Sequence, residues 1–292
     1  ALKTIYDKGL IYKGHKIVPY CPRCGTALSS HEVAQGYKDV TEKSAFVRFK
    51  TDFGYILAWT TTPWTLPSNV ALCVNPESDY AYVSADGTTY LLAADLVGAV
   101  LGEDAKIEKT VKGRTLEGIR YEPLYTWAGA GDDAYRVVSD GYVTLTDGTG
   151  VVHIAPSFGE DDARVGQRFG LPFVQLVDDR GRFKDGCGEI TGVFCKDADK
   201  WILKDLAGRG LLFKAPPFTH SYPFCWRCDT PLLYYARSTW FIRMTEVRDR
   251  LMKNNATVNW YPESIGKGRF GNFLENVIDW GLSRDRYWGT PL

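Results

Sequence analysis

The stretch "AWTTTPWTLPSN", Ala58 to Asn69, places three consecutive threonines between two tryptophans and follows them with prolines. The threonines at 60–62 favour extended backbone because their side chains are β-branched. Pro63 and Pro67 are expected to exclude a helix here, and each removes a backbone donor from a sheet. The stretch therefore predicts a strand that ends abruptly and carries hydroxyl groups at its tip. Such a tip suits the wall of a small polar pocket, and it also suits an ordinary strand end.

Short strands dominate the sequence around this stretch. "SAFVRFK" alternates apolar and polar residues, and "DYAYVSADGTTYLLA" predicts a hairpin that turns at Asp86-Gly87. "GYVTLTDGTGVVHIAP" predicts a second hairpin at Asp147-Gly148. Helices are expected in "AADLVGAVLG", "GEDDARVGQRFG" and "DADKWILKDLAGRG". Many short strands with few helices predict a mixed, β-rich α/β fold, in which a curved or β-barrel-like sheet carries peripheral helices.

The chain divides into three regions that differ in their residue pattern. Residues 1–43 form an N-terminal connecting arm with a first C-x-x-C pair, and residues 44–214 form the strand-rich region. Residues 215–292 form a C-terminal connecting arm with a second C-x-x-C pair. If the two pairs share one metal, the two arms meet in space, and the middle region is a domain inserted between them.

The composition narrows the class of protein. The chain is 45% hydrophobic and 24% charged, and it has no apolar run near the roughly 20 residues of a membrane span. Lys+Arg and Asp+Glu both total 35, so any contact with nucleic acid must use local patches of charge. No signal peptide is visible, and an odd count of seven cysteines suits a reducing compartment. We expect a cytoplasmic protein that does not bind membranes.

Four of the cysteines form two pairs, Cys21-Pro-Arg-Cys24 and Cys225-Trp-Arg-Cys228. Each C-x-x-C turn supplies two thiolates at the spacing that tetrahedral zinc needs, so the sequence predicts one structural zinc with four cysteine ligands. Two unrelated turns with reduced thiols are the alternative. A redox motif is disfavoured because neither pair opens a helix in a βαβ unit. The remaining cysteines are expected to be packing residues: Cys73, Cys187 and Cys195.

The segment "GTGVVHIAPSFGEDDARVGQRFG" places His153 at a strand end and three acidic residues at a helix start. Acidic residues in a first helical turn often only complement the helix dipole, and a lone histidine in a strand is often a hydrogen-bonded core residue. The sequence contains no Ser-His-Asp or Cys-His arrangement, nucleophile elbow, phosphate loop or H-E-x-x-H motif. If the protein is an enzyme, we therefore expect water to be the nucleophile.

Taken together, "AWTTTPWTLPSN", "GTGVVHIAPSFGEDD", "SYPFCWRC" and "SRDRYWGTPL" resemble class I isoleucyl-tRNA synthetases, in the family's order and over essentially the whole chain. Valyl and leucyl enzymes typically show Thr-Thr-Arg-Pro, whereas here Thr62 precedes Pro63 and Trp64 follows it. We find no H-I-G-H-type or K-M-S-K-S-type motif. The resemblance implies the editing insertion (connective peptide 1) with its connecting arms. ATP and Mg would serve the parent enzyme only.

The resemblance also implies an activity and its partners. Residues 44–214 would hydrolyse valine wrongly esterified to the isoleucine tRNA, with water as nucleophile. The partners would be the 3′ end of that tRNA and the rest of the synthetase, and we expect a monomer. Two alternatives stay open: a non-catalytic, zinc-stapled tRNA-binding module, and a valyl-type editing domain that clears threonine.

Residue roles follow from the same resemblance. Asp162 would hold the substrate's α-ammonium, with Asp161 as the alternative carboxylate, and His153 would limit side-chain size. The three threonines would surround the ester carbonyl and the attacking water, while three further residues would frame the pocket. The threonines are Thr60, Thr61 and Thr62. The residues that would frame the pocket are Trp59, Trp64 and Asn69.

Overall fold

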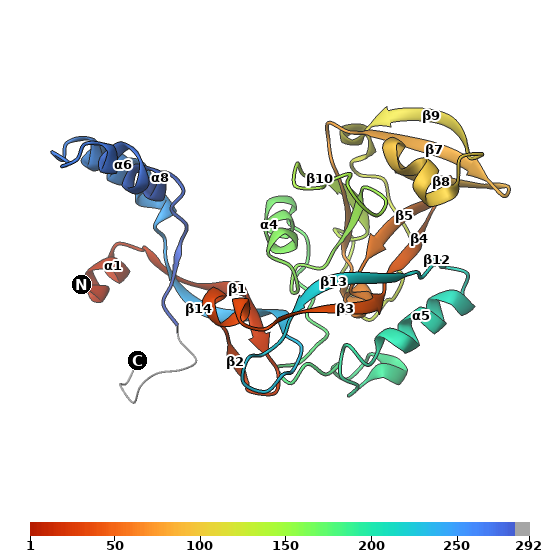
Figure 1. The fold of residues 1–292 in the computed structure, drawn as a ribbon, viewed down its shortest axis with the longest axis horizontal. Coiled ribbons are helices and arrows are strands. Elements are labelled where there is room, and N and C mark those ends of the chain that lie inside the picture. Colours follow the sequence, from red (N-terminus) through yellow and green to blue (C-terminus); the bar gives the residue numbers. More distant parts are fainter. Residues whose placement is uncertain (284–292) are drawn as a thin grey trace. The chain divides into compact units, whose positions relative to one another are not determined.

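The computed structural model describes residues 1–283, and the chain divides into two compact units (Figure 1). One unit comprises residues 17–235, and the other comprises residues 1–16 together with the chain from residue 236 onward. Apart from Ser283, the predicted segment "SRDRYWGTPL" lies outside the described residues. All predicted site residues belong to the unit formed by residues 17–235.

The largest sheet of this unit has six strands in the order β12-β4-β5-β8-β7-β9. Their bounds are β4 Ala45–Thr51, β5 Gly54–Thr60, β7 Asp79–Ala85, β8 Thr88–Ala93, β9 Lys106–Lys112 and β12 Leu212–Lys214. The predicted hairpin between β7 and β8 is confirmed, with Asp86 and Gly87 both at positive φ, as a tight type I′ turn requires. Among the described residues the sheet is open, with β12 and β9 at its edges, and it does not close into a barrel.

A smaller sheet has three strands in the order β10-β6-β11, namely β10 Arg136–Ser139, β6 Ala71–Val74 and β11 Val151–Ile154. The predicted hairpin at Asp147-Gly148 is wrong, because β11 pairs antiparallel with β6 and not with the residues before the turn. The preceding residues bind elsewhere: Asn75 Nδ2 donates to the Val143 carbonyl at 2.9 Å. The partner of β11 is therefore β6, a strand distant in the sequence, and not the segment just before the turn.

Helices and 3₁₀ turns lie around these two sheets. The helices are α3 Val97–Leu101, α4 Glu160–Phe169 and α5 Asp199–Gly208, and the 3₁₀ turns are η1 Pro63–Ser68, η2 Ala94–Leu96, η3 Gly113–Leu116 and η4 Gly188–Ile190. The core is built from fully buried side chains such as Phe49, Ile56, Leu72 and Leu91. The predicted mixed, β-rich fold with peripheral helices is confirmed.

A two-stranded ribbon, β3 Tyr37–Lys43 and β13 Pro217–Pro223, joins the six-stranded sheet at its β12 edge, because β3 continues into β4 and β13 follows β12 (Figure 1). All seven residues of β3 pair antiparallel with β13, and the Ser44 amide donates to the Pro216 carbonyl at 3.0 Å. Near the other end of the ribbon lie β2 Thr26–Ala27 and α2 Ser30–Ala34, whose start is fixed by a capping box between Ser29 and Glu32.

The other unit is mainly helical. It contains α1 Leu2–Asp7, η5 Thr245–Val247, α6 Arg248–Ala256, α7 Ser264–Lys267, α8 Arg269–Glu275 and β15 Trp280–Gly281. Trp260 ties its helices together, since Nε1 donates to Asn255 Oδ1 at 2.9 Å and the ring lies 5.0 Å from that of Phe270. The chain passes between the units within β1 Ile11–Cys21 and β14 Leu233–Ile242. None of the described helices is long and apolar enough to cross a bilayer.

Candidate functional site

The threonine stretch forms the end of β5 and the turn that follows it. β5 ends at Thr60, as the prolines predict. The expectation that they exclude a helix is wrong for the 3₁₀ form, because the 3₁₀ turn η1 begins at Pro63 and contains Pro67. The Thr62 amide donates to Thr60 Oγ1 at 3.0 Å, and the two hydroxyl oxygens lie 3.2 Å apart. The hydroxyl groups of Thr60 and Thr62 are therefore held by the backbone turn that carries them.

Thr65 extends this row of hydroxyls and joins it to His153. Its Oγ1 lies 3.3 Å from Thr62 Oγ1, donates to the Thr62 carbonyl at 2.8 Å, and lies 2.9 Å from His153 Nε2. Because a hydroxyl has one proton and Thr65 gives it to that carbonyl, Nε2 must be the donor in the contact with His153. Sequence reasoning missed Thr65, although it lies in the quoted stretch three residues after Thr62.

His153 is a neutral, buried side chain. Burial lowers its pKa to about 4, so the ring carries no charge at neutral pH. With the proton on Nε2, the other ring nitrogen is an acceptor, and Nδ1 is buried without a partner among the described residues. The ring thus presents an uncharged surface and is poorly suited to be a general base through Nε2.

Asp162 is a half-buried carboxylate in the first turn of α4. Burial raises its pKa to about 7, against the opposing effect of the Ala155 amide, which donates to Oδ2 at 2.9 Å. No cation lies within ion-pair distance of this carboxylate in residues 1–283. A Cβ at Gly159 would lie 2.8 Å from Asp162 Cγ, so the glycine leaves the space that the side chain occupies.

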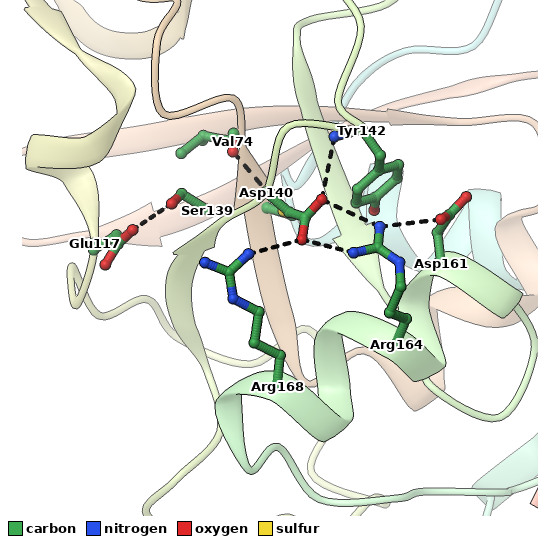
Figure 2. Close-up of polar contacts among 9 residues, drawn as sticks. Val74, Glu117, Ser139, Asp140, Tyr142, Asp161, Arg164 and Arg168 are labelled. Atoms are coloured by element: carbon green, nitrogen blue, oxygen red, sulfur yellow. Dashed lines mark hydrogen bonds and ion pairs between the residues drawn. The ribbon is translucent and has the colours of Figure 1, made fainter. Parts of the chain in front are cut away.

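Asp161 points elsewhere. It is exposed, and its Oδ1 accepts from Arg164 Nη2 at 3.1 Å (Figure 2). Neighbouring residues on a helix are turned by about 100°, so only one of the two carboxylates can face a given site. Of these two carboxylates, Asp162 is the one that has no ion-pair partner within residues 1–283.

The threonine stretch and the segment around His153 and Asp162 lie side by side. The Val70 amide donates to the Ile154 carbonyl at 2.9 Å, and the Trp64 ring packs edge-on against Phe158 with centroids 4.9 Å apart. Trp64 is almost fully buried in this contact. These contacts, together with the bond between Thr65 and His153, bring the predicted threonines and His153 into one region.

Trp59 and Asn69 are held by other neighbours. Trp59 is half-buried against Phe46 and Phe218, and as the strand neighbour of Thr60 it points to the opposite face of the sheet. The buried Asn69 side chain is engaged at both ends: Nδ2 donates to the Ala71 carbonyl at 2.8 Å, and Oδ1 accepts from Tyr121 Oη at 2.6 Å. A role for either residue at the substrate stays a prediction.

The four predicted metal ligands lie together. Their sulfur atoms are all within 4.8 Å of one another, and three of the separations are 3.5 Å for Cys21–Cys228, 3.5 Å for Cys24–Cys228 and 3.9 Å for Cys24–Cys225. Zinc–sulfur bonds of about 2.3 Å place tetrahedral ligands about 3.8 Å apart, so the cluster fits the ion. The three other cysteines are buried.

A family model described as tRNA synthetases class I (I, L, M and V) matches residues 1–292. The chain therefore belongs to the class I tRNA synthetases of the isoleucine, leucine, methionine and valine group.

Isoleucine–tRNA ligases are among the similar proteins. The chain is 57% identical over 295 residues to "Isoleucine--tRNA ligase" of Clostridium novyi (strain NT), which covers 100% of this chain and 28% of that protein. It is 52% identical to the protein of the same name from Picrophilus torridus, with 100% and 29% covered. The chain thus spans somewhat more than a quarter of the length of these relatives.

Among solved structures, the leucyl-tRNA synthetase editing domain of P. knowlesi is similar with a TM-score of 0.47 and 12% identity, over 64% of this chain and 98% of that chain.

Proposed function

We propose that residues 44–214 form a hydrolytic editing domain that removes valine from the isoleucine tRNA. One observation carries the proposal: Asp162 is a half-buried carboxylate without an ion-pair partner among the described residues, and it lies nine residues after His153 in the chain. The Nε2 atom of His153 is hydrogen-bonded to the hydroxyl of Thr65, which in turn lies 3.3 Å from that of Thr62. Close similarity to isoleucine–tRNA ligases supports the assignment to this amino acid.

The need for a second site follows from the size of a methylene group. A pocket shaped for isoleucine discriminates against valine by only about 1–3 kcal/mol, a limit for which the isoleucine enzyme is itself the standard example. A second site must accept valine and reject isoleucine by bulk. The neutral His153 ring suits such a wall, because a buried uncharged ring can face an aliphatic side chain without a desolvation cost for charge.

In the proposed substrate pose, each of three parts of the valyl ester contacts a different part of the site. The α-ammonium of the valyl group pairs with Asp162, which supplies a charge-assisted bond to a cation that the free site lacks. The isopropyl group faces His153, and the ester carbonyl faces the threonine hydroxyls at 60–62. The pose leaves Asp161 on the outside with Arg164.

Hydrolysis then proceeds with water as nucleophile. Water adds to the ester carbonyl carbon, the threonine hydroxyls donate to the developing oxyanion, and the bond from carbonyl carbon to ribose oxygen breaks. One proton of the water ends on the ribose oxygen, and the products are valine and free tRNA. The neighbouring hydroxyl of the terminal adenosine could relay that proton, because His153 Nε2 already carries one.

The metal and the partners complete the proposal. Cys21, Cys24, Cys225 and Cys228 would hold a zinc ion that stabilises the folded cluster and takes no part in the reaction. The partners are the 3′ end of the misacylated tRNA and the remaining parts of a cytoplasmic synthetase. ATP and Mg belong to aminoacylation elsewhere in such an enzyme.

Deacylation assays test the function. The chain is expected to hydrolyse valyl-tRNA(Ile) faster than isoleucyl-tRNA(Ile) and threonyl-tRNA(Val), and Asp162→Ala is expected to reduce the first rate to background. Asp161→Ala, one residue away and exposed, is the matched control and should keep the rate. A chain that binds tRNA but hydrolyses no ester would be a binding module, and preference for the threonyl ester would indicate valyl-type editing.

A further inference from the structure

Asp140 fixes helix α4 to the three-stranded sheet (Figure 2). Its carboxylate accepts two bonds from Arg164, at 2.9 Å to Oδ2 and 3.1 Å to Oδ1, and a third from Arg168 at 3.1 Å. The Tyr142 amide donates to Oδ1 at 3.2 Å. The Asp140 amide donates to the Val74 carbonyl of β6 at 3.0 Å. Asp140 is thus bound to the sheet through its backbone and to the helix through its side chain.

The carboxylate of Asp140 is buried, whereas the two arginines that bind it are largely exposed. The Asp140 side chain is only 7% exposed, whereas those of Arg164 and Arg168 are 51% and 61% exposed. The hydrogen bond from Arg164 lowers the pKa of Asp140, so the residue stays ionised. A buried carboxylate depends on its partners, and a two-pronged arginine contact fixes orientation as well as distance. The pair therefore sets the rotation of α4 about its axis.

That rotation determines where Asp162 points. Asp162 precedes Arg164 by two residues, which is about 200° around a helix, so the two side chains leave α4 on nearly opposite sides. Arg164 faces Asp140 on one side, and Asp162 faces the Ala155 amide on the other. A turn of the helix that loosened the first contact would move the second.

The same sheet carries the opposite wall of the proposed site. β10, which ends one residue before Asp140, and β11, which carries His153, both pair with β6. The contacts of Asp140 with α4 therefore fix the position of Asp162 relative to His153, because Asp140 follows β10, His153 lies on β11, and β6 is hydrogen-bonded to both strands. Neither Arg164 nor Arg168 reaches the row of threonine hydroxyls in the contacts described for residues 1–283, so they act on that side through α4.

We propose that Asp140 is a positioning residue of the editing site: it holds α4 in the orientation at which Asp162 meets the α-ammonium of the substrate. The inference rests on the proposed function and deepens it. Asp161 supplies a matched control, because it also binds Arg164, at 3.1 Å, but from the exposed side of the helix.

The test compares two esters on the same tRNA, in the full chain. One is valyl-tRNA(Ile), and the other carries the α-hydroxy analogue of valine, which lacks the ammonium group. Asp140→Asn is expected to lower kcat/KM for the valyl ester by about tenfold, mainly through KM, because a small misplacement of a binding group is costly. The α-hydroxy ester lacks the contact with Asp162, so the wild type should hydrolyse it more slowly than the valyl ester, and Asp140→Asn should hydrolyse it at the same reduced rate as the wild type. Asp161→Asn should change neither substrate.

Each outcome decides the inference. An equal loss on both esters would show a merely structural role and overturn it, as would an unchanged KM for the valyl ester. If thermal unfolding shows that Asp140→Asn does not fold, Arg168→Gln removes one of the three arginine bonds and should raise KM for the valyl ester alone, by about threefold. If the wild-type chain hydrolyses neither ester, the proposed function itself fails. If Asp162→Ala abolishes hydrolysis and Asp140→Asn does not alter it, only the positioning role fails.

Discussion

The Nε2 atom of His153 lies 2.9 Å from the hydroxyl oxygen of Thr65, although the residues are 88 positions apart in the chain. Because Thr65 donates its own proton to the Thr62 carbonyl, this contact fixes the proton of His153 on Nε2. The bond therefore sets both the tautomer and the orientation of the ring that we propose as the sieve wall.

Thr65→Val should destabilise the protein and weaken discrimination. The variant removes the acceptor of the Nε2 proton, and Nδ1 already lacks a partner among the described residues. We expect the free energy of unfolding to fall by about 1–3 kcal/mol, the cost of a buried donor left unpaired. Urea denaturation measures this, and the ratio of valyl to isoleucyl ester hydrolysis should fall. Thr65→Ser keeps the acceptor and should retain both properties; equal stability of the valine variant would contradict the assigned contact.

Editing should lose rate as the pH falls below about 7. The pKa of Asp162 is raised to about 7 by burial, and only its ionised form can pair with the ammonium group. The rate of valyl-tRNA(Ile) deacylation, corrected for spontaneous hydrolysis, should rise through pH 7 and level off above it. His153, whose pKa is about 4, should not contribute in this range. A flat profile between pH 6 and 8 would exclude Asp162 as the titrating group, because a carboxyl group with an ordinary pKa of about 4 is already fully ionised in this range.

Asp162→Asn should stabilise the fold at neutral and alkaline pH while removing activity. The pKa of Asp162 is about 7 in the folded chain against an ordinary value of 3.8 for an exposed aspartate, so between these values the folded state binds the proton more tightly. The free energy of unfolding of the wild type therefore falls as pH rises through this window. Asparagine keeps an acceptor for the Ala155 amide without the charge, and we expect a gain of about 1–3 kcal/mol above pH 7. Thermal unfolding at pH 5 and pH 8 should show a larger difference at pH 8; a variant less stable at pH 8 would refute the assigned burial cost.

Removing the predicted metal should destabilise the cysteine cluster. Cys21→Ser combined with Cys225→Ser leaves two of the four sulfur ligands, so the purified variant should contain no zinc and unfold at a lower temperature. Elemental analysis and thermal unfolding measure this. Cys187→Ser, at a buried cysteine outside the cluster, should keep one zinc per chain. Zinc that persists in the double variant would show that the four cysteines do not share an ion.

Local signals in the sequence predicted much of the fold. Asp86-Gly87 predicted a hairpin because both residues readily adopt positive φ, as they do in the structure. The prolines that follow Thr62 predicted the end of β5, which is at Thr60. The helix over 160–169 follows from its acidic first turn and from Gly170, which ends it in the left-handed conformation. The gathering of the two C-x-x-C pairs was also predictable, because each supplies half of a tetrahedral ligand set.

Contacts between distant segments were not predictable in the same way. The hairpin at Asp147-Gly148 failed because β11 takes its partner from β6, which no local signal encodes. Asp140 gave no motif, since its partners Arg164 and Arg168 lie 24 and 28 residues away in the chain. The choice of Asp162 over Asp161 needed a family resemblance, because both carboxylates fit the same helix start.

A structure of the chain with a non-hydrolysable valyl-adenosine analogue bound tests the central claim most directly. We predict that the ammonium nitrogen lies about 2.7–2.9 Å from an Asp162 carboxylate oxygen, with the isopropyl group against His153 and the carbonyl oxygen toward the threonine hydroxyls. An analogue bound with its ammonium away from Asp162, or with its side chain away from His153, would contradict the account.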